Sequence, residues 1–499
     1  MELKFPKSTC RYLNPVVNQV QNLELTQELR LSDGMPDIGR ILGGWGQVIL
    51  RGKEWRSDSA AFSGGLMAWV LYAPEDGTLP RVMESWIPFQ MKWDLEDGRR
   101  EGGIRIQCLL RFVDARSVSA RKIMLRAGIG ALGEATQPHE AEYGMAGEMP
   151  EDVQILKTMY PVRLPREVGE KAFMVDEDLA FPGSCPRPEK LIYYNMQPVI
   201  TEKKITGGKV VMRGSGNLHV LYLSEEGQVH SWDFELPFSQ LAELERAYGA
   251  DAQADVRMAV TGLEAELDDE SHLRLKTGLL AQYLVDDREM LELVEDAYSP
   301  GRTVELDRRT LELPAILERK TEPVRASQTI HQDANLIADA EFLPDFPRLR
   351  RSGDQIRMEL PGQFQTLYYG KNGQLQSANA RWEGESVFRA DDGSSMDAVL
   401  LPVGRPGAAA AEETMELTAD AALQMSVMSR QGIPMVMGLE LGEQAPIDSE
   451  RPSVILRRAG EDRLWDIAKS TGSTVSAIQK ANGLETEPAS NQFLLIPVK

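Results

Sequence analysis

Cysteine is scarce in this chain. Its 499 residues include only three, Cys10, Cys108 and Cys185, which lie far apart and form no CxxC pair. A small disulfide-stapled secreted protein carries an even set of cysteines at close spacing, and a structural zinc site needs clustered Cys or His. The sequence therefore predicts free thiols in a reducing compartment and no structural metal.

Histidine and the usual catalytic motifs are also missing or rare. None of the five histidines has a second His or Cys at ligand spacing, and we interpret His219 and His230 as exposed or hydrogen-bonded strand residues. No GxxxxGK[ST] phosphate loop, no HExxH motif and no GxSxG motif is present. The repeated segments described below share no recurring acid pair. We therefore predict a protein without enzymatic activity and without a nucleotide or metal cofactor.

Long apolar runs and a basic surplus are absent as well. No run reaches the ~18–20 apolar residues of a membrane-spanning helix. The start of the chain, Met1 to Pro6, lacks the apolar core of a signal peptide. Asp and Glu number 76 against 55 Lys and Arg, a net charge of −21. The negative electrostatic field of such a chain repels nucleic acid and anionic lipid, so we expect neither as a partner. We also expect no membrane insertion and a cytoplasmic location.

The sequence does contain a threefold repeat of one short pattern. A Leu-Tyr pair, with a glycine five residues after the tyrosine, occurs at Tyr72, Tyr222 and Tyr368, and the glycines are Gly77, Gly227 and Gly373. The tyrosines lie 150 and 146 residues apart, which is the length of a domain and not of a solenoid repeat. Asp-Gly, Glu-Gly and Asn-Gly at the glycines favour β-hairpin turns with φ > 0.

Period-two alternation follows the second hairpin. Trp232, Phe234 and Leu236 alternate with polar residues, which is typical of a strand with one buried face. We expect this strand to end at Pro237, and the corresponding strand of the first copy to end at Pro88. More strand-like segments follow each hairpin, as in antiparallel sandwiches and barrels.

The chain is therefore predicted to be mostly β. We expect three antiparallel β-sandwich or barrel-like repeat domains, over residues 1–150, 151–310 and 311–447. Two segments within them, 240–248 and 287–298, are predicted to be short helices. The stretch from Gly442 to Pro452 is the clearest linker, being rich in charge and proline.

After the linker, residues 453–499 predict a small α+β module. Residues 454–457 and 493–498 are strand-like, and two short helices lie between them. Asp462 is the expected N-cap of the first helix and Gly472 its stop, and Asn482-Gly483 ends the second. The expected order is strand, helix, helix, strand.

This module resembles a LysM domain. The resemblance is based on three motifs: Leu464-Trp465-Asp466-Ile467-Ala468, Val475 to Asn482, and Leu494-Leu495-Ile496-Pro497. The resemblance implies a groove for N-acetylglucosamine units of peptidoglycan or chitin, between the loop before the first helix and the loop after the second. Carried over by position, the groove residues are Glu461, Asp462, Arg463, Leu464 and Trp465 on one side, and Asn482, Gly483, Leu484 and the 487–492 loop with Asn491 on the other.

Two departures from the LysM pattern favour a protein ligand over a sugar. Glu461-Asp462-Arg463 replaces the usual Gly-Asp-Thr, and Ser490-Asn491-Gln492 replaces Pro-Gly-Gln. Aromatic and arginine side chains dominate protein interfaces. We therefore predict Arg463 and Trp465 as the main partner contacts, with Asn482 and Leu484 across the groove.

The repeats resemble the SPOCS domain. The Pro-Asp-Ile lead-in at Met35–Leu42, the Leu-Tyr hairpin and the Pro-Phe pair carry this similarity. SPOCS repeats followed by one LysM domain are the layout of SipL-like spore morphogenetic proteins. This implies a non-enzymatic scaffold of spore coat assembly in the mother-cell cytosol, at the surface of the developing spore, whose LysM domain docks onto the coat-basement ATPase. The alternative is a peptidoglycan-binding LysM protein of the cell wall or spore cortex.

Overall fold

The computed structural model describes residues 2–96, 101–268, 272–411, 413–444, 452–489 and 491–498. Antiparallel strands dominate it, and the two helices of the described residues lie near the C-terminus. The prediction of a mostly β, antiparallel protein is confirmed. The three cysteines are free, as expected. No helix in the described ranges has the length and apolar character needed to cross a membrane.

The strands form three successive units. The first contains β2 (Lys7–Arg30), β3 (Ile38–Trp55), β4 (Ser59–Pro74), β5 (Arg81–Asp94), β6 (Gly103–Ser119) and β7 (Lys122–Gly144). The second contains β8 (Gln154–Ala180), β9 (Pro188–Thr206), β10 (Lys209–Ser224), β11 (Val229–Glu243), β12 (Gln253–Leu267) and β13 (His272–Tyr298). The third contains β14 (Arg302–Ile330), β15 (Ala334–Pro344), β16 (Arg348–Ser352), β17 (Gln355–Gly370), β18 (Leu375–Arg389), β19 (Ser395–Ala410) and β20 (Met415–Gln444).

The long strands of each unit pair in the same way. The first and last strands pair with each other, and the last also pairs with the strand before it, as in β2-β7-β6, β8-β13-β12 and β14-β20-β19. The remaining strands form a second sheet, β3-β4-β5 or β9-β10-β11. In the third unit β17 pairs with β15, β16 and β18, and β20 pairs with β14, β19 and the short β1 (Glu2–Lys4). The predicted boundary at residue 310 falls inside β14.

The repeated tyrosines occupy corresponding positions. Tyr72, Tyr222 and Tyr368 lie on the middle strands β4, β10 and β17 and are almost fully buried. Their hydroxyls donate to the carbonyls of Pro36 and Pro186 at 3.1 Å, and in the third unit to the side chain of Gln332 at 2.9 Å. In each case the acceptor lies 36 residues upstream.

The hairpin turns also follow the prediction. Gly77, Gly227 and Gly373 have φ values of 75°, 78° and 71°, in the left-handed region where a side chain is strained. The strand pairs β4/β5, β10/β11 and β17/β18 flank these turns.

Two strand predictions are wrong. β5 and β11 continue through Pro88 and Pro237 instead of ending there. Both are edge strands, and an edge strand tolerates a residue without an N–H on its open side.

Two helix predictions are wrong as well. The helices expected at 240–248 and 287–298 are absent, because β11 runs to Glu243 and β13 runs to Tyr298. β13 pairs with β8 over this whole stretch, so long-range pairing overrides the local helical pattern.

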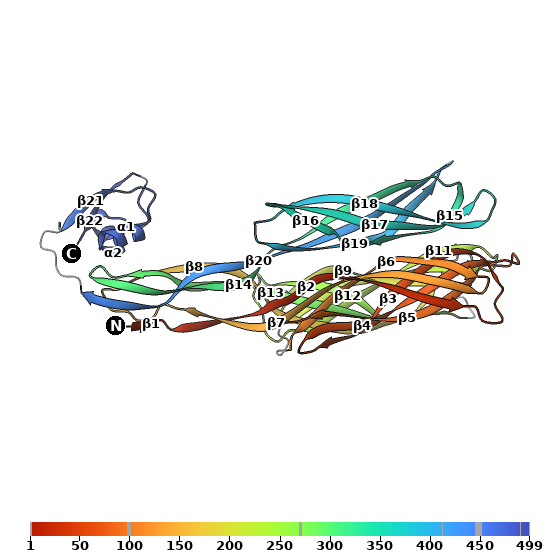
Figure 1. Cartoon of the computed structure of the whole chain (residues 1–499), viewed down its shortest axis with the longest axis horizontal. Helices are drawn as coiled ribbons and strands as arrows, with labels where there is room; N and C mark the ends of the chain where they lie inside the picture. The colour runs from red at the N-terminus through yellow and green to blue at the C-terminus, as the bar shows by residue number, and fades with distance from the viewer. Residues whose placement is uncertain are drawn as a thin grey trace.

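The six longest strands extend beyond the sheets to form a stalk (Figure 1). Their ends make three antiparallel ribbons, β2/β7, β8/β13 and β14/β20, one from each unit. The ribbons share one apolar core, to which every long strand contributes: Cys10, Tyr12, Tyr143, Val162, Leu164, Leu291, Leu293, Leu311, Leu313, Ile433, Met435 and Met437. Each unit therefore has its own core and also contributes to the shared apolar core of the stalk.

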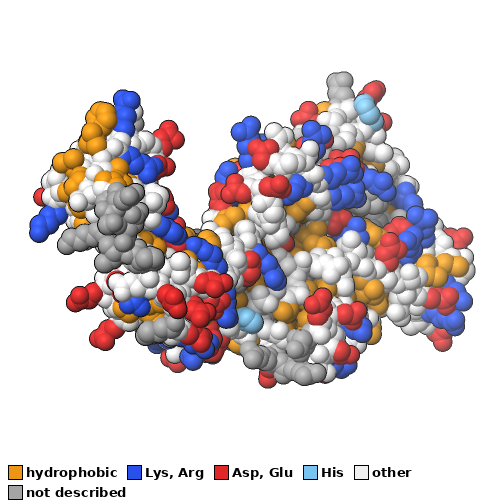
Figure 2. All heavy atoms as spheres, turned by 60° about the vertical axis from the view of Figure 1, so that its left-hand side comes forward, with side chains coloured by type: hydrophobic (Ala, Val, Ile, Leu, Met, Phe, Trp, Pro, Cys, Tyr) orange, Lys and Arg blue, Asp and Glu red, His pale blue; other side chains and the backbone are white. Residues whose placement is uncertain are grey.

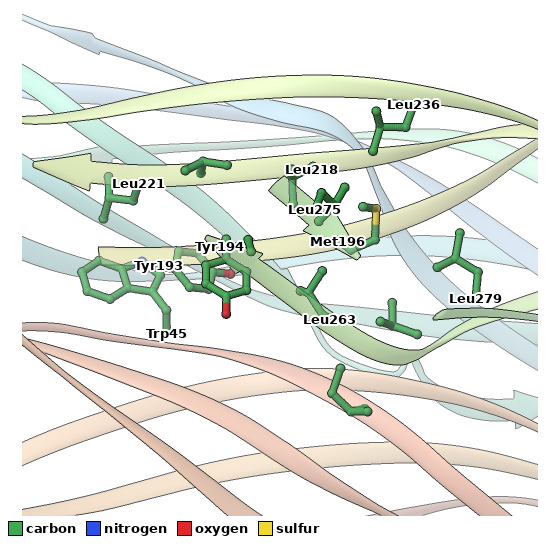
Figure 3. Packing of buried hydrophobic residues seen from close by; sticks show 14 of the residues in the cluster. Trp45, Tyr193, Tyr194, Met196, Leu218, Leu221, Leu236, Leu263, Leu275 and Leu279 are labelled. Carbon is green, nitrogen blue, oxygen red and sulfur yellow. The ribbon is translucent and has the colours of Figure 1, made fainter. Parts of the chain in front are cut away.

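The two sheets of each unit enclose a core, and the cores of the first two units are continuous. Trp45 of β3 packs on Tyr193 of β9 with ring centroids 5.7 Å apart (Figure 3). Trp69 of β4 meets both Tyr193 and Tyr194 edge-on, at 5.2 and 5.0 Å. These contacts join the first and second units by aromatic packing.

The C-terminal module has the predicted order of elements: β21 (Val454–Arg458), α1 (Leu464–Thr471), α2 (Val475–Asn482) and β22 (Phe493–Pro497). Thr474 caps α2 by accepting from the Ala477 N–H at 3.1 Å, and Gly472 and Gly483 end the two helices with φ of 64°. The expected cap of α1 is wrong: Arg463 is the N-cap, and Asp462 pairs with Arg457 instead. Most of the predicted linker, residues 445–451, lies outside the described residues.

Candidate functional site: the C-terminal module and its junction with the stalk

The module packs its two helices on one face of the β21/β22 sheet. Ile467, Ala468 and Ile478 from the helices and Leu494 and Ile496 from β22 are fully buried. A residue of the stalk, Tyr298 at the end of β13, belongs to the same cluster. The module is therefore seated on the tip of the stalk, as Figure 1 shows.

An aromatic pair forms the apolar part of this junction. The rings of Tyr298 and Trp465 meet edge-on with centroids 4.8 Å apart. The Tyr298 hydroxyl donates to the Ser473 carbonyl at 2.9 Å. Trp465 is only 6% exposed as a result, so its ring is covered by this chain's own stalk.

Acidic residues beside Tyr298 receive the polar groups of α1. Asp296 accepts from the Trp465 indole N–H at 2.9 Å and pairs with Lys469 at 2.6 Å. Glu295 pairs with Arg463 at 3.2 Å. Partial burial alone raises the pKa of Asp296, but the hydrogen bonds from Lys469 and Trp465 outweigh it and hold the pKa below its ordinary value. The carboxylate is thus charged, and it is shared between α1 and Arg308 of the stalk, which pairs with it at 2.6 Å.

The predicted groove is bridged by a hydrogen bond within the module. The backbone N–H of Leu464, at the start of α1, donates to the Glu487 carboxylate at 2.8 Å. A carboxylate at a helix N-terminus is favourable, since it satisfies an N–H that has no partner within the helix. Glu487 therefore links the two walls between which a sugar would lie.

Asn482 has a structural role in the opposite wall. Its amide N–H groups donate to the carbonyls of Ile478 and Leu495 at 2.8 and 2.7 Å, and its side-chain oxygen accepts from the Leu495 N–H at 2.7 Å. The side chain thereby ties α2 to β22. Gly483 ends α2, and Leu484 packs against the module core.

The remaining predicted residues face solvent. Glu461, Asp462 and Asn491 are exposed. Asn491 has a φ of 68°, and its N–H donates to the Ala459 carbonyl at 2.8 Å. The structure thus brings the predicted residues together in one module, but it divides them among the stalk contact, internal hydrogen bonds and open surface.

Sequence reasoning missed Glu295, Asp296 and Tyr298. They lie about as far from α1 in sequence as one whole unit, with separations of 168 to 175 residues. No local motif marks them, and the stretch that contains them resembles a helix. Only the pairing of β13 with β8 carries them to the tip of the stalk.

A second candidate is a cavity of about 890 Å³ where the three units meet. It is lined by β3 and β6, by β9 to β12, and by β15, β19 and β20. At one wall His219 contacts Asp233 at 2.7 Å and Asp339 at 3.2 Å, and Arg405 pairs with Asp339 at 2.7 Å. Burial alone lowers the pKa of His219, but the attraction of Asp339 and the carboxylate hydrogen bonds raise it overall. This cluster joins the second unit to the third.

One group of side chains could hold a metal ion among the residues that the structure describes. Asp178, Asp268 and His272 lie within 4.8 Å of one another at the outer end of the second unit. Internal partners already engage them, since His272 lies 3.4 Å from Asp178 and Arg274 lies 3.7 Å from Asp268. The group is explained by these ion pairs.

Comparison with known proteins identifies part of the second unit. Residues 188–268 match the family model described as SipL, SPOCS domain. The matched residues span β9, β10, β11 and β12, and the match indicates a sporulation-related role. No curated protein and no solved structure matches the chain.

Proposed function

We propose that this protein is a non-enzymatic scaffold of spore envelope assembly, of the SipL-like type. The observation that carries the proposal is the SPOCS match over residues 188–268. The protein is proposed to act in the mother-cell cytosol at the surface of the developing spore.

The three strand units, β2 to β7, β8 to β13 and β14 to β20, are proposed to be three SPOCS-type domains, with the second boundary moved from residue 310 to the start of β14. The repeated strand order and the three equivalent tyrosines support this division. The shared stalk core supports a scaffold role, because it fixes the units relative to one another and presents the module at one end.

The C-terminal module is proposed to be a LysM domain that binds a protein. The Glu487 bridge to Leu464 supports a protein ligand over a sugar, because a glycan would have to displace it from between the groove walls. The proposed partner is the coat-basement ATPase. Glycan binding to peptidoglycan or N-acetylglucosamine oligomers is the competing function, and it requires the two walls to separate.

A binding experiment separates the two functions. The full chain and a variant lacking residues 452–499 are titrated with purified coat-basement ATPase, and sedimented with purified peptidoglycan. We expect ATPase binding by the full chain alone, and no retention on peptidoglycan by either protein. Peptidoglycan retention that depends on residues 452–499, without ATPase binding, contradicts the proposal and supports the glycan function.

A further inference from the structure

The sheet of the C-terminal module exposes an apolar face. We define the outer face as Val454, Leu456 and Arg458 of β21 with Phe493 and Leu495 of β22. Its four apolar side chains are 52%, 63%, 63% and 48% exposed, in the order Val454, Leu456, Phe493 and Leu495. Scattered exposed apolar residues are ordinary, whereas a contiguous group on one small face marks an interaction site.

Strand register makes the outer face contiguous. Leu456 lies opposite Leu495 and Arg458 lies opposite Phe493 in the antiparallel pair. Side chains opposite each other on one face of a sheet lie in contact distance. The Arg458 guanidinium sits 6.0 Å from the centroid of the Phe493 ring. Three large apolar side chains and one cation thus form the centre of the face.

The β21/β22 sheet lacks the usual alternation of apolar and polar side chains between a buried face and an exposed face. The residues between the outer-face positions, Ile455, Leu494 and Ile496, point to the helices, and the last two are fully buried. An antiparallel sheet with one face in solvent usually has polar residues on that face. Here both faces are apolar although only one is covered.

The docked module presents this face to solvent. The helices contact the stalk through Trp465 and Lys469, so the sheet lies on the far side of the module from the stalk (Figure 1). Figure 2 shows hydrophobic side chains gathered on this lobe, beside Lys and Arg. Any partner of the outer face can therefore bind without releasing the module.

We propose that the outer face docks an amphipathic segment of a protein partner, with an apolar stripe and a carboxylate beside it. The apolar stripe would cover Leu456, Leu495 and Phe493. The carboxylate would meet Arg458, which pairs with no acidic side chain among the described residues. This inference rests on the proposed function and assigns its protein-binding surface to the sheet, away from Arg463 and Trp465.

A lipid surface fits the same face less well. The outer face carries a single arginine, whereas attraction to an anionic bilayer needs a cluster of several basic residues, each contributing about 1 kcal/mol. A second copy of the chain brings the same arginine to the contact and supplies no carboxylate there. Charge complementarity therefore selects an acidic amphipathic segment.

The test titrates the full chain with synthetic helical peptides of about 18 residues, long enough for five turns. Each peptide has a leucine stripe, flanked either by glutamates or by lysines. We expect the glutamate peptide to bind at least ~10-fold more tightly than the lysine peptide, and Leu456→Asp with Phe493→Asp to weaken it at least ~10-fold. Arg458→Glu should remove the preference for glutamate.

Controls make the outcome specific. Leu241→Asp alters an equally exposed leucine (51%) on β11 of the body and should leave peptide affinity unchanged. Circular dichroism of the double variant should match the parent, because both positions are exposed. Equal peptide binding by the double variant overturns the inference, as does tighter outer-face binding to phosphatidylglycerol vesicles or self-association that the double variant abolishes.

The coat-basement ATPase distinguishes failure of this inference from failure of the proposed function. If the ATPase binds the parent and the double variant equally, the outer face is not the docking surface and the scaffold function stands. If the ATPase does not bind the parent chain, the proposed function itself fails.

Discussion

The interfaces among the three units differ from the junction between the module and the stalk. Between the first two units, Arg105 pairs with Asp255 and Arg257 pairs with Glu134, and the Arg105 and Glu134 side chains are only 3% and 5% exposed. At the module junction, Arg463 and Lys469 remain 52% and 39% exposed. Ion pairs occur at both places, but those between the units are largely buried, whereas the basic side chains at the module junction are exposed to water.

This difference decides how strongly each contact depends on its charges. Removing one member of a buried pair leaves an uncompensated charge, whereas an exposed pair contributes little because water and salt screen it. The three units, which together form the body of the protein, should therefore unfold cooperatively, and their stability should depend on the buried charges between them. The exposed ion pairs at the module junction should contribute little to docking, which depends mainly on the buried contact between Tyr298 and Trp465.

The largest expected effect is on the buried network. Glu134→Ala leaves Arg105 and Arg257 facing each other without the carboxylate that both contact, and it should lower the free energy of unfolding by ~3–5 kcal/mol. Urea denaturation followed by circular dichroism measures this. Glu140→Ala, which removes a 55% exposed partner of Arg11, is the matched control and should change stability by less than ~1 kcal/mol. Equal effects of the two substitutions would erase the contrast between buried and exposed pairs.

An intermediate effect is expected where the first and third units meet. Asn18 of β2 donates to Asp397 of β19, and burial raises the pKa of Asp397 to about 6. A raised pKa means that this group favours folding below its ordinary value near 4 and loses that contribution as pH rises through about 6. The parent should therefore lose roughly 1–2 kcal/mol of unfolding free energy between pH 5 and 7 because of this group, and Asp397→Asn should abolish that loss.

Denaturation midpoints of the parent and of Asp397→Asn at several pH values check this. The parent should lose stability relative to the variant as pH rises from 5 to 7. Parallel curves for the two proteins would mean that Asp397 titrates as an ordinary surface carboxylate.

The smallest effect on folding is expected at the module junction. Asp296→Ala removes the acceptor of Trp465 and Lys469 and should weaken docking of the module by about 1 kcal/mol. It also removes the partner of Arg308 on β14, but that arginine is 55% exposed, so the body's Tm should change little. Energy transfer between dyes on the module and the stalk measures docking. Asp307→Ala, at a 49% exposed aspartate of β14, is the control.

Docking should also respond to acid. The pKa of Asp296 is lowered, so its contribution is present above the ordinary value of 3.8 and is lost as pH falls below it. In the Asp296→Ala variant this acid-dependent release should disappear. A body that unfolds together with the module in either experiment would show that the two regions are not separable.

Local signals in the sequence were sufficient for the features that depend on neighbouring residues. The three hairpins were predicted because Gly77, Gly227 and Gly373 adopt φ > 0, which glycine does without strain. The order of the C-terminal module was predicted from its apolar spacing and from Gly472 and Gly483, which end α1 and α2 in the left-handed conformation.

The tertiary structure alone decided the features that depend on distant partners. Residues 287–298 form a strand because β8 supplies a pairing edge along their whole length, and Pro237 is tolerated inside β11 because that strand lies at a sheet edge. The environment of Trp465 was decided in the same way. Its indole is buried against Asp296 and Tyr298, more than 160 residues earlier in the chain. Sequence spacing carries no information on such contacts, because they arise only when the β8/β13 ribbon has formed and brought its end to the module.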